Sequence, residues 1–253
     1  MSSGETPFSI VLPTVYGQMI VNRHDTKRTQ ALISTGRAHD HEEIAMLTTC
    51  LKLRGGDGMV VDAGSNVGTH ALAFAAAIGP GRPVHAFEPQ RLIFNMLAGN
   101  VALNAATNIH CHNVALGDRD GRIAAPQFDY TKPLNFGAVE FGGVQREPLE
   151  QQPGDDPARR EHVPLARLDS FQFGPIALLK IDVEGMEMQL LDGATQTVQR
   201  TRPIIYVEYH KSDGAALSAR VSAWDYAVYL SALNYLCIPA ELAEVIPVQI
   251  HSG

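Results

Sequence analysis

Short apolar runs alternate with longer segments of helical periodicity along most of this chain. Five of the runs have the length and the β-branched content of buried strands: Met59–Asp62, Pro83–Phe87, Asn108–Val114, Ile176–Ile181 and Arg202–His210. Helical patterns separate them: Thr69–Ile78, Arg91–Asn104, Met186–Val198 and a segment containing Trp224 and Leu230. Two further runs, Tyr235–Pro239 and Val245–Ile250, are expected to close the chain as its final strands. This alternation predicts a doubly wound α/β sheet.

The first fifty residues are expected to precede the core as a separate segment. Apolar runs on either side of Tyr16-Gly17 predict a β-hairpin, and Ile44, Leu47 and Leu51 have the spacing of one helix face. The cluster His39-Asp-His-Glu-Glu opens that helix. It suits helix capping, a wall of the substrate entrance or a set of metal ligands, and capping is the usual role of acidic residues at a helix start.

The rest of the chain, residues 51–253, is expected to be the ligand-binding domain, with residues 1–50 packed on it as a hairpin and helix. Residues 119–167 lack regular periodicity and are rich in proline, glycine and charge. Long insertions in compact domains are usually functional. We therefore expect residues 119–167 to form a loop or hairpin that covers the ligand crevice as a lid.

A glycine-rich turn follows the first core strand, in Asp62-Ala-Gly-Ser-Asn-Val-Gly-Thr69. Gly64 and Gly68 provide the conformational freedom of a tight turn and allow a ligand to approach the main chain. The helix that starts at Thr69 directs free N–H groups at the crevice. At the end of the next strand, about 20 residues past the turn, Glu88 is placed to accept the two hydroxyls of an adenosine ribose. Glu88 would otherwise be a carboxylate at a helix start.

More polar groups follow the later strands. Asn113 and Val114 end the third strand, where they would lie against adenine, and Asp182, Glu184, Glu208 and His210 follow the fourth and fifth. Carboxyl ends of parallel strands meet at one sheet edge. The sequence therefore predicts a nucleoside-type cofactor beside a carboxylate-rich half of the cleft.

Composition narrows the classes of partner. The formal charge of −7 over 253 residues argues against a nucleic-acid or anionic-membrane surface, so neither partner is expected. Three distant cysteines make no zinc or disulfide framework and favour a reducing cytoplasm. We expect neither a secretory signal nor a transmembrane helix, because no segment has the required apolar length.

Four segments together resemble the FkbM-type S-adenosylmethionine-dependent methyltransferases: Asp62-Ala-Gly-Ser-Asn-Val-Gly, Ala86-Phe-Glu-Pro, Leu168-Asp-Ser-Phe and Leu179-Lys-Ile-Asp-Val-Glu-Gly-Met-Glu. The similarity runs from about Tyr16 to Tyr235, and Asp129-Tyr130 with Asn135-Phe-Gly137 resembles the signature of one subgroup. The resemblance implies a class I methyltransferase fold, a Rossmann-like sheet of seven strands whose last strand is antiparallel. It also implies methyl transfer to a hydroxyl, commonly on a sugar, glycan or natural-product acceptor.

The resemblance also suggests roles for single residues. S-adenosylmethionine would lie against the cofactor-binding residues Asp62, Gly64, Ser65, Asn66, Gly68, Thr69, Glu88, Pro89, Asn113, Val114 and Asp182. Transfer to an alcohol requires a general base. Asp182 or Glu184 is the first candidate and His210 the next, with Glu208 at the adjacent strand end. Glu184 would otherwise be a turn carboxylate that pairs with Lys180.

Four alternatives stay open at this point. Asp182 and Glu208 could hold Mg²⁺, as in catechol-type methyltransferases, although carboxylates at strand ends more often only orient substrate; no metal ligand is assigned. A nicotinamide-dependent oxidoreductase would also use a glycine turn, but usually Gly-x-Gly-x-x-Gly. A non-catalytic module that kept the cofactor pocket, and a peptide or other non-sugar acceptor, also remain possible readings.

Overall fold

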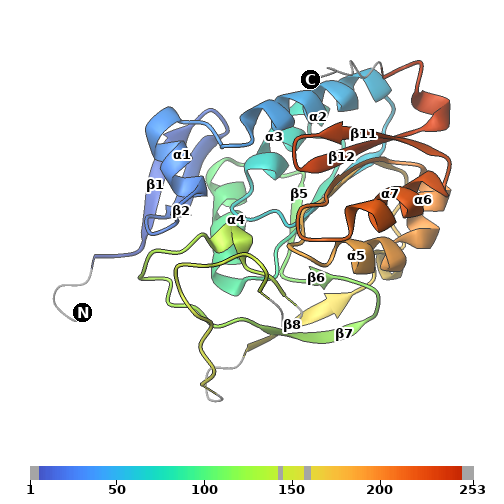
Figure 1. Cartoon of the computed structure of the whole chain (residues 1–253). Coiled ribbons are helices and arrows are strands. Elements are labelled where there is room, and N and C mark those ends of the chain that lie inside the picture. Colours follow the sequence, from blue (N-terminus) through green and yellow to red (C-terminus); the bar gives the residue numbers. More distant parts are fainter. Residues whose placement is uncertain (1–5, 142–144, 157–160, 247–253) are drawn as a thin grey trace.

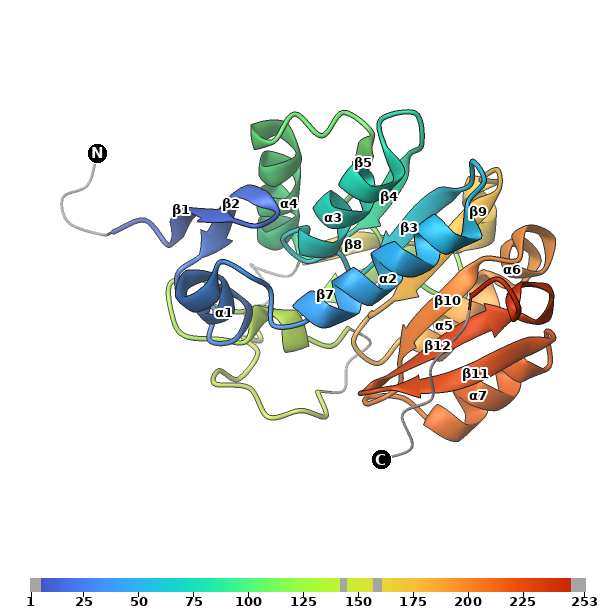
Figure 2. The same cartoon turned by 90° about the horizontal axis from the view of Figure 1, so that it is seen from above.

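The computed structural model describes residues 6–141, 145–156 and 161–246 of the chain. Its main sheet has seven strands in the order β11-β12-β10-β9-β3-β4-β5. Figure 1 shows the whole chain, and Figure 2 labels every strand of this sheet. Their bounds are β3 Met59–Ala63, β4 Val84–Phe87, β5 Ile109–His112, β9 Ile176–Ile181, β10 Ile204–Glu208, β11 Tyr226–Ser231 and β12 Asn234–Pro239.

The last strand of this sheet, β12, is antiparallel to both of its neighbours, β10 and β11. The pairs β3–β4, β4–β5, β3–β9 and β9–β10 are parallel. The strand order reverses between β3 and β9, so their carboxyl ends border the crevice where open α/β sheets bind ligands. The predicted fold class, a seven-stranded class I methyltransferase sheet with an antiparallel last strand, is confirmed.

Helices cover both faces of the sheet (Figure 2). On one face α2 His41–Arg54, α3 Thr69–Ile78 and α4 Arg91–Leu103 bury their apolar residues, and on the other α5 Glu187–Gly193, α6 Thr195–Thr201 and α7 Gly214–Ser222 do so. Side chains alternate along each strand: Val60 and Val61 are both fully buried but belong to opposite clusters. Burial on both faces explains why the central strands are almost entirely apolar.

The segment before the sheet packs on α4. The hairpin of β1 Ser9–Thr14 and β2 Gly17–Asn22 is present, and Asn100 of α4 accepts a hydrogen bond from Ile20 N (2.5 Å) and donates to Ile20 O (3.0 Å). A short helix that the sequence reading missed, α1 Arg28–Thr35, follows the hairpin. Asp25 caps it, because its Oδ1 accepts from the backbone N–H groups of residues 27–29 at 2.6–3.1 Å.

The insertion between β5 and β9 contains a small second sheet. Strands β6 Ala115–Leu116, β7 Gly121–Ala125 and β8 Glu161–Ala166 pair in the order β6-β8-β7. Between β7 and β8 the chain makes the short 3₁₀ helix η1, Phe136–Ala138, and lies beside the α1 end of the molecule in both ribbon views (Figures 1 and 2). Two further 3₁₀ helices are η3 Leu168–Phe171 and η4 Ala240–Leu242.

Three predictions of local structure are wrong. No single helix contains Trp224 and Leu230: α7 ends at Ser222, and Leu230 lies in β11, where the β-forming run Tyr226-Ala-Val-Tyr-Leu pairs with β12. The expected helix from Met186 to Val198 is broken at Ala194 into α5 and α6. The strand predicted for residues 245–250 is absent at its first two residues: Val245 and Ile246 donate backbone hydrogen bonds to Leu242 in a turn, and residues 247–250 lie outside the described residues.

Among the described residues no helix is both long enough and apolar enough to span a membrane.

Candidate active site

The glycine turn between β3 and α3 is held by main-chain contacts. Gly64 and Ser65 donate their N–H groups to Phe87 O at 3.0 and 2.9 Å, which ties the turn to β4. Gly64 has φ +79°, and a Cβ built on it would lie 1.7 Å from the carbonyl oxygen of Asp182. Only glycine therefore fits at Gly64, and the turn lies directly against the chain that leaves β9.

Glu88 closes one side of this turn. Its carboxylate accepts hydrogen bonds from Asn66 N at 3.0 Å and Gln90 N at 2.8 Å, and its residue is only 3% exposed. Burial raises the pKa of Glu88 to about 7, against the lowering effect of the two backbone hydrogen bonds. The two N–H donors fix the direction of the carboxylate, while each of its oxygens keeps a lone pair for a further donor.

A cavity with about 540 Å³ of atom-free space, partly open to solvent, lies between the turn, Glu88 and the insertion. We call it the glycine-turn cavity. Its walls are mostly apolar, with Phe87, Val114, Leu116 and Met186 on the sheet side and Val139 with Phe141 from the insertion. Apolar walls with a few directed polar groups are typical of small-ligand and cofactor pockets.

The residues of the glycine-turn cavity fit an adenosyl sulfonium cofactor. The apolar walls suit a purine ring, and Glu88 presents a fixed carboxylate to hydroxyl donors. Below the turn Asp62 is fully buried outside the cavity wall; its carboxylate accepts no hydrogen bond from the described residues, and Lys180 Nζ lies 3.5 Å from its Oδ1. Asp62 therefore balances the charge of Lys180 beneath the turn.

A cluster of three carboxylates lies at the ends of β9 and β10. Each of Asp182, Glu184 and Glu208 places an oxygen within 4.8 Å of the others. Glu184 stands on the turn after β9 with φ +53°, and the carboxylate of Glu187 fixes that turn by accepting the N–H groups of Val183 (3.2 Å) and Gly185 (3.0 Å). Ser212 also hydrogen-bonds to Glu187, which ties this turn to the chain after β10.

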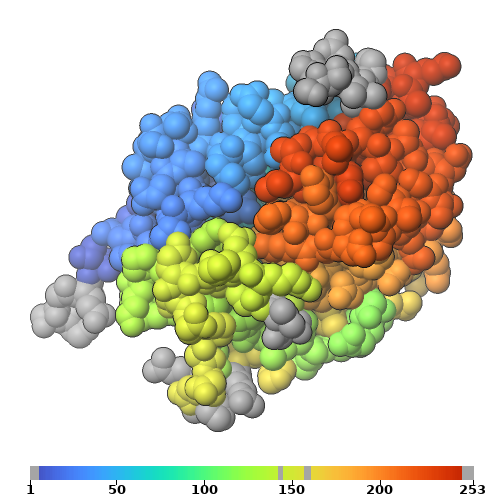
Figure 3. Space-filling view, in the orientation of Figure 1, coloured from blue at the N-terminus to red at the C-terminus, as the bar shows by residue number. Residues whose placement is uncertain are grey.

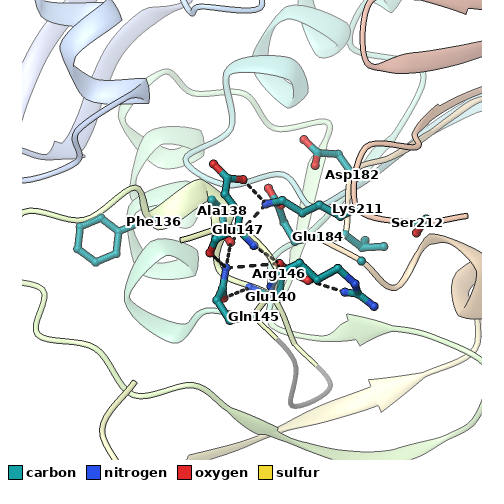
Figure 4. A network of polar contacts seen from close by, with 12 residues as sticks. Phe136, Ala138, Glu140, Gln145, Arg146, Glu147, Asp182, Glu184, Lys211 and Ser212 are labelled. Atoms are coloured by element: carbon teal, nitrogen blue, oxygen red, sulfur yellow. Dashed lines mark hydrogen bonds and ion pairs between the residues drawn. The ribbon is translucent and has the colours of Figure 1, made fainter. Parts of the chain in front are cut away.

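Three cations compensate this cluster. Lys180 places Nζ 3.4 Å from Asp182 Oδ2 and 3.5 Å from Asp62 Oδ1, and donates to Gly64 O at 3.1 Å. Arg28 of α1 lies 3.5 Å from Asp182 Oδ2. Lys211 pairs with Glu184 and also, at 2.9 Å, with Glu147 of the insertion (Figure 4). The alternative in which Glu184 pairs with Lys180 is therefore wrong, since the cation paired with Glu184 is Lys211.

The carboxylates of this cluster differ in acidity. Burial alone would raise the pKa of Asp182, but Lys180 and Arg28 hold it below its ordinary value. Burial, followed by the charges of Asp182 and Glu208, raises the pKa of Glu184 well above its ordinary value in spite of Lys211. Burial and Asp182 raise the pKa of Glu208 to about 8. Carboxylates whose environments separate their pKa values are typical of acid–base sites.

A second, more polar cavity opens beyond the cluster, and we call it the acidic cavity. Its walls include Asp40, Glu43, Glu147, Glu208 and His210. Several buried polar atoms at its edge have no hydrogen-bond partner among the described residues: Asp40 Oδ1, His70 Nε2, Asp182 Oδ1 and Glu208 Oε2. Unused donors and acceptors on the wall of an open cavity suit a ligand with several hydroxyl groups.

The two cavities meet at four residues. Arg28, Gly137, Asp182 and Glu184 line both. Gly137 allows this junction to be narrow, because a Cβ built on it would lie 2.3 Å from Arg28 Nε. A group held in one cavity can thus reach a group held in the other only past Asp182 and Glu184.

The insertion covers the junction through a second charge network (Figure 4). Glu140, whose side chain is fully buried, accepts from Arg146 N (2.6 Å) and Glu147 N (3.2 Å) and pairs with Arg146 Nη1 (2.5 Å). Glu147, positioned in this way, meets Lys211 from the opposite side. The space-filling view shows the insertion and the chain after β10 in contact on this face (Figure 3).

The part of the chain that forms the sheet and most of the site is similar to a known protein family. A family model described as the methyltransferase FkbM domain matches residues 62–236, well over half of the chain. The chain belongs to the FkbM methyltransferase family.

Two curated methyltransferases and a solved structure are similar to the chain over part of their own length. Methyltransferase 1 of Beauveria bassiana (strain ARSEF 2860) is 27% identical over 146 residues, which cover 54% of this chain and 58% of that protein. Methyltransferase sdnD of Sordaria araneosa is 27% identical over 159 residues, covering 54% and 60%. The chain thus spans about 60% of the length of these curated relatives. A solved methyltransferase FkbM from Methylobacillus flagellatus KT is 16% identical, with a TM-score of 0.48, covering 72% of this chain and 42% of that one.

Within the FkbM domain the predicted site residues separate into two groups. Gly64, Asn66, Glu88, Pro89, Val114, Asp182 and Glu184 line the glycine-turn cavity, and Glu208 and His210 line the acidic cavity. Asp62, Ser65, Gly68, Thr69 and Asn113 do not line the glycine-turn cavity. Ser65 Oγ donates to Asp62 O, and Asn113 Nδ2 donates to the carbonyls of Glu88 and Pro89, so both side chains support the turn and the chain beyond β4.

The sequence analysis missed Arg28, Lys211 and the role of Glu187, and it named Asp40 only as part of the cluster His39–Glu43, for which a wall of the substrate entrance was one interpretation. Arg28 and Asp40 lie outside the residues that the FkbM model matches, and only the tertiary fold brings them to the junction. Lys211 follows His210 directly, and its position after β10 is the one local signal that could have found it. Glu187 stands in the segment that carried the family resemblance, but its role is to fix the turn.

Proposed function

We propose that this chain transfers a methyl group from S-adenosylmethionine to a hydroxyl oxygen of a polyhydroxylated small molecule, a sugar, glycan or natural product. The observation that carries the proposal is the junction of the two cavities. The glycine-turn cavity fits the donor, the acidic cavity has unused polar atoms for an acceptor, and the two share Asp182 and Glu184.

On the donor side the protein binds and orients. Glu88 would hold the ribose hydroxyls, and Val114 with Leu116 would face the adenine. Asn113, whose side chain donates to the carbonyls of Glu88 and Pro89, would support this wall from outside the cavity. Gly64 would lie beside the methionine portion, and the buried pair of Lys180 and Asp62 would support the turn from outside the cavity wall. Bound S-adenosylmethionine supplies a methyl group on a positively charged sulfur, which makes it electrophilic without help from the protein. The main task of the residues is therefore alignment.

On the acceptor side the protein removes a proton. The hydroxyl proton must go to a base as the oxygen–carbon bond forms and the carbon–sulfur bond breaks. Glu184 suits this role, because it faces both cavities and burial together with Asp182 and Glu208 makes it a stronger base than an exposed carboxylate. Asp182, which Lys180 and Arg28 keep ionised, would orient the acceptor and the sulfonium. His210 is exposed at the outer rim, a second position for a base.

Calorimetry and mass spectrometry test the proposal together. The chain should bind S-adenosylhomocysteine and show no binding of NAD, which separates a methyltransferase from an oxidoreductase. Incubation with methyl-labelled donor and a panel of monosaccharides, polyols and hydroxylated peptides should label a polyol product. Label on nitrogen, or on a peptide in place of a sugar, would replace the acceptor part of the proposal. Donor binding without any labelled product would favour a non-catalytic module.

A further inference from the structure

Arg28 occupies an unusual place for a residue of the first helix. Its backbone starts α1, outside the FkbM match, and its guanidinium lies 3.6 Å from Asp40 Oδ2 and 3.5 Å from Asp182 Oδ2. It packs against Gly137 of the insertion, where a Cβ would collide with Nε at 2.3 Å. The guanidinium therefore lies where the two cavities meet and where the segment before the sheet contacts the insertion.

Within the described part of the chain, Arg28 is the only cationic side chain that lines the glycine-turn cavity. The same wall carries three carboxylates, from Glu88, Asp182 and Glu184. Lys180 and Lys211, the other cations of the junction, line only the acidic cavity. Among the described residues of this wall, Arg28 is thus the one charged side chain that would attract an anionic group.

The donor capacity of Arg28 is largely unused. Its two ion pairs, at 3.5 and 3.6 Å, are longer than ordinary charge-assisted hydrogen bonds, and its guanidinium donates no hydrogen bond to any described residue. A guanidinium has five N–H donors in a planar fork that matches the two oxygens of a carboxylate. Its charge is nevertheless retained, because the surrounding acids raise its pKa above the ordinary value against the effect of burial.

We infer that Arg28 binds the carboxylate of the methionine portion of the donor, so that the segment before the FkbM domain completes the cofactor site. This inference rests on the proposed function. Asp40 and Asp182 would keep the guanidinium in place, and N–H donors that it does not use in hydrogen bonds to described residues would bind the donor's carboxylate. Arg28 is then a binding residue that selects cofactors with a carboxylate.

The test compares two ligands that differ in this carboxylate alone. S-adenosylhomocysteine and its decarboxylated analogue, 5′-(3-aminopropylthio)adenosine, are titrated by calorimetry into the wild type, Arg28→Gln, Arg28→Lys and Arg37→Gln. The wild type should bind S-adenosylhomocysteine about 10- to 100-fold more tightly than the analogue, the range of a charge-assisted bidentate pair. Arg28→Gln should lose this preference and bind the analogue as the wild type does. Arg28→Lys should keep part of it.

Arg37→Gln is the matched control, because Arg37 is an exposed arginine of the same segment that lines neither cavity. It should leave both affinities unchanged. Equal affinity of the wild type for the two ligands would overturn the inference, and so would an equal loss for both ligands in Arg28→Gln, since Arg28 would then act only through the fold. If the wild type binds neither ligand, the proposed function itself fails, whereas equal binding of both ligands overturns only the inference about Arg28.

Discussion

The glycine-turn cavity and the acidic cavity obtain their chemistry from different parts of the chain. The first is shaped by backbone: Gly64 and Ser65 bond to Phe87 O, and two N–H groups fix Glu88. The second is shaped by charged side chains that come from distant segments, such as Asp40 before the sheet and Lys211 after β10. Backbone contacts set a rigid shape, whereas paired charges set pKa values. Substitutions should therefore divide into those that change donor affinity and those that change the rate of transfer.

The largest effect is expected from Glu184→Gln, which removes the proposed base but keeps its size. The turnover number should fall about 10²- to 10⁴-fold, the usual contribution of general base catalysis. Binding of S-adenosylhomocysteine should stay within about threefold of the wild type, because Glu88 and the turn are untouched. Steady-state kinetics and calorimetry on one preparation measure both. Lost donor affinity with an unchanged turnover number would show that Glu184 binds the donor and is not the base.

Gly64→Ala should produce the opposite result, a loss of donor binding. Its Cβ would overlap the Asp182 carbonyl at 1.7 Å, which forces the turn away from β9. Gly79→Ala is the matched control: Gly79 has nearly the same φ, +80°, but no atom lies within 4 Å of its Cβ. Gly79→Ala should cost only the conformational strain, about 1–3 kcal/mol of unfolding free energy, with normal donor affinity. If Gly64→Ala bound the donor as Gly79→Ala does, the close approach would not shape the cavity.

Glu88→Gln should weaken donor binding about 10- to 100-fold, because the amide presents an N–H₂ group to one of the two backbone N–H donors that now hold the carboxylate. The wild type should also bind S-adenosylhomocysteine more tightly as pH rises through about 7, since ionised Glu88 accepts more hydrogen bonds than its protonated form. Calorimetry between pH 6 and pH 8 checks the direction. The dependence should disappear in Glu88→Gln, and its persistence there would assign it to another group.

A smaller, diagnostic effect is expected in the pH profile of turnover. A base must lose its proton before it can act, so the rate should rise with pH above the range of an exposed carboxylate, because Glu184 and Glu208 titrate together and both have raised pKa values. Glu208→Gln removes a negative neighbour and should shift this rise to lower pH, whereas Lys211→Gln removes a cation and should shift it to higher pH. Profiles that do not move in either variant would place the base elsewhere, with His210→Asn as the next variant to measure.

The difference between the two cavities also explains which parts of the fold and of the site the sequence could predict. The sheet, Glu88 and the turn at Gly64 follow from local patterns, since strand, turn and helix are adjacent in the chain. Arg28 gives no such signal, because α1 is short and its cap is Asp25, three residues before it. Leu230 gives an ambiguous signal, because a single apolar residue fits the period of a helix as well as that of a strand. Only the pairing of its strand with β12 determines the structure there. The ion-pair partner of Glu184 shows the same limit: Lys180 is close to it in sequence, but the fold brings Lys211 to its carboxylate.

The smallest effect should come from chelation, and it sharpens the description of the acidic cluster. Asp182, Glu184 and Glu208 bring oxygens within 4.8 Å of one another, an arrangement that could hold Mg²⁺. However, Arg28 and Lys180 lie 3.5 and 3.4 Å from Asp182, and Lys211 pairs with Glu184. A divalent ion placed among the three carboxylates would face these cations at close range and would have to displace them. Turnover should therefore be unchanged in excess EDTA. Loss of activity that Mg²⁺ restores would show that the cations yield to a metal, and the acidic cavity would then be a metal centre.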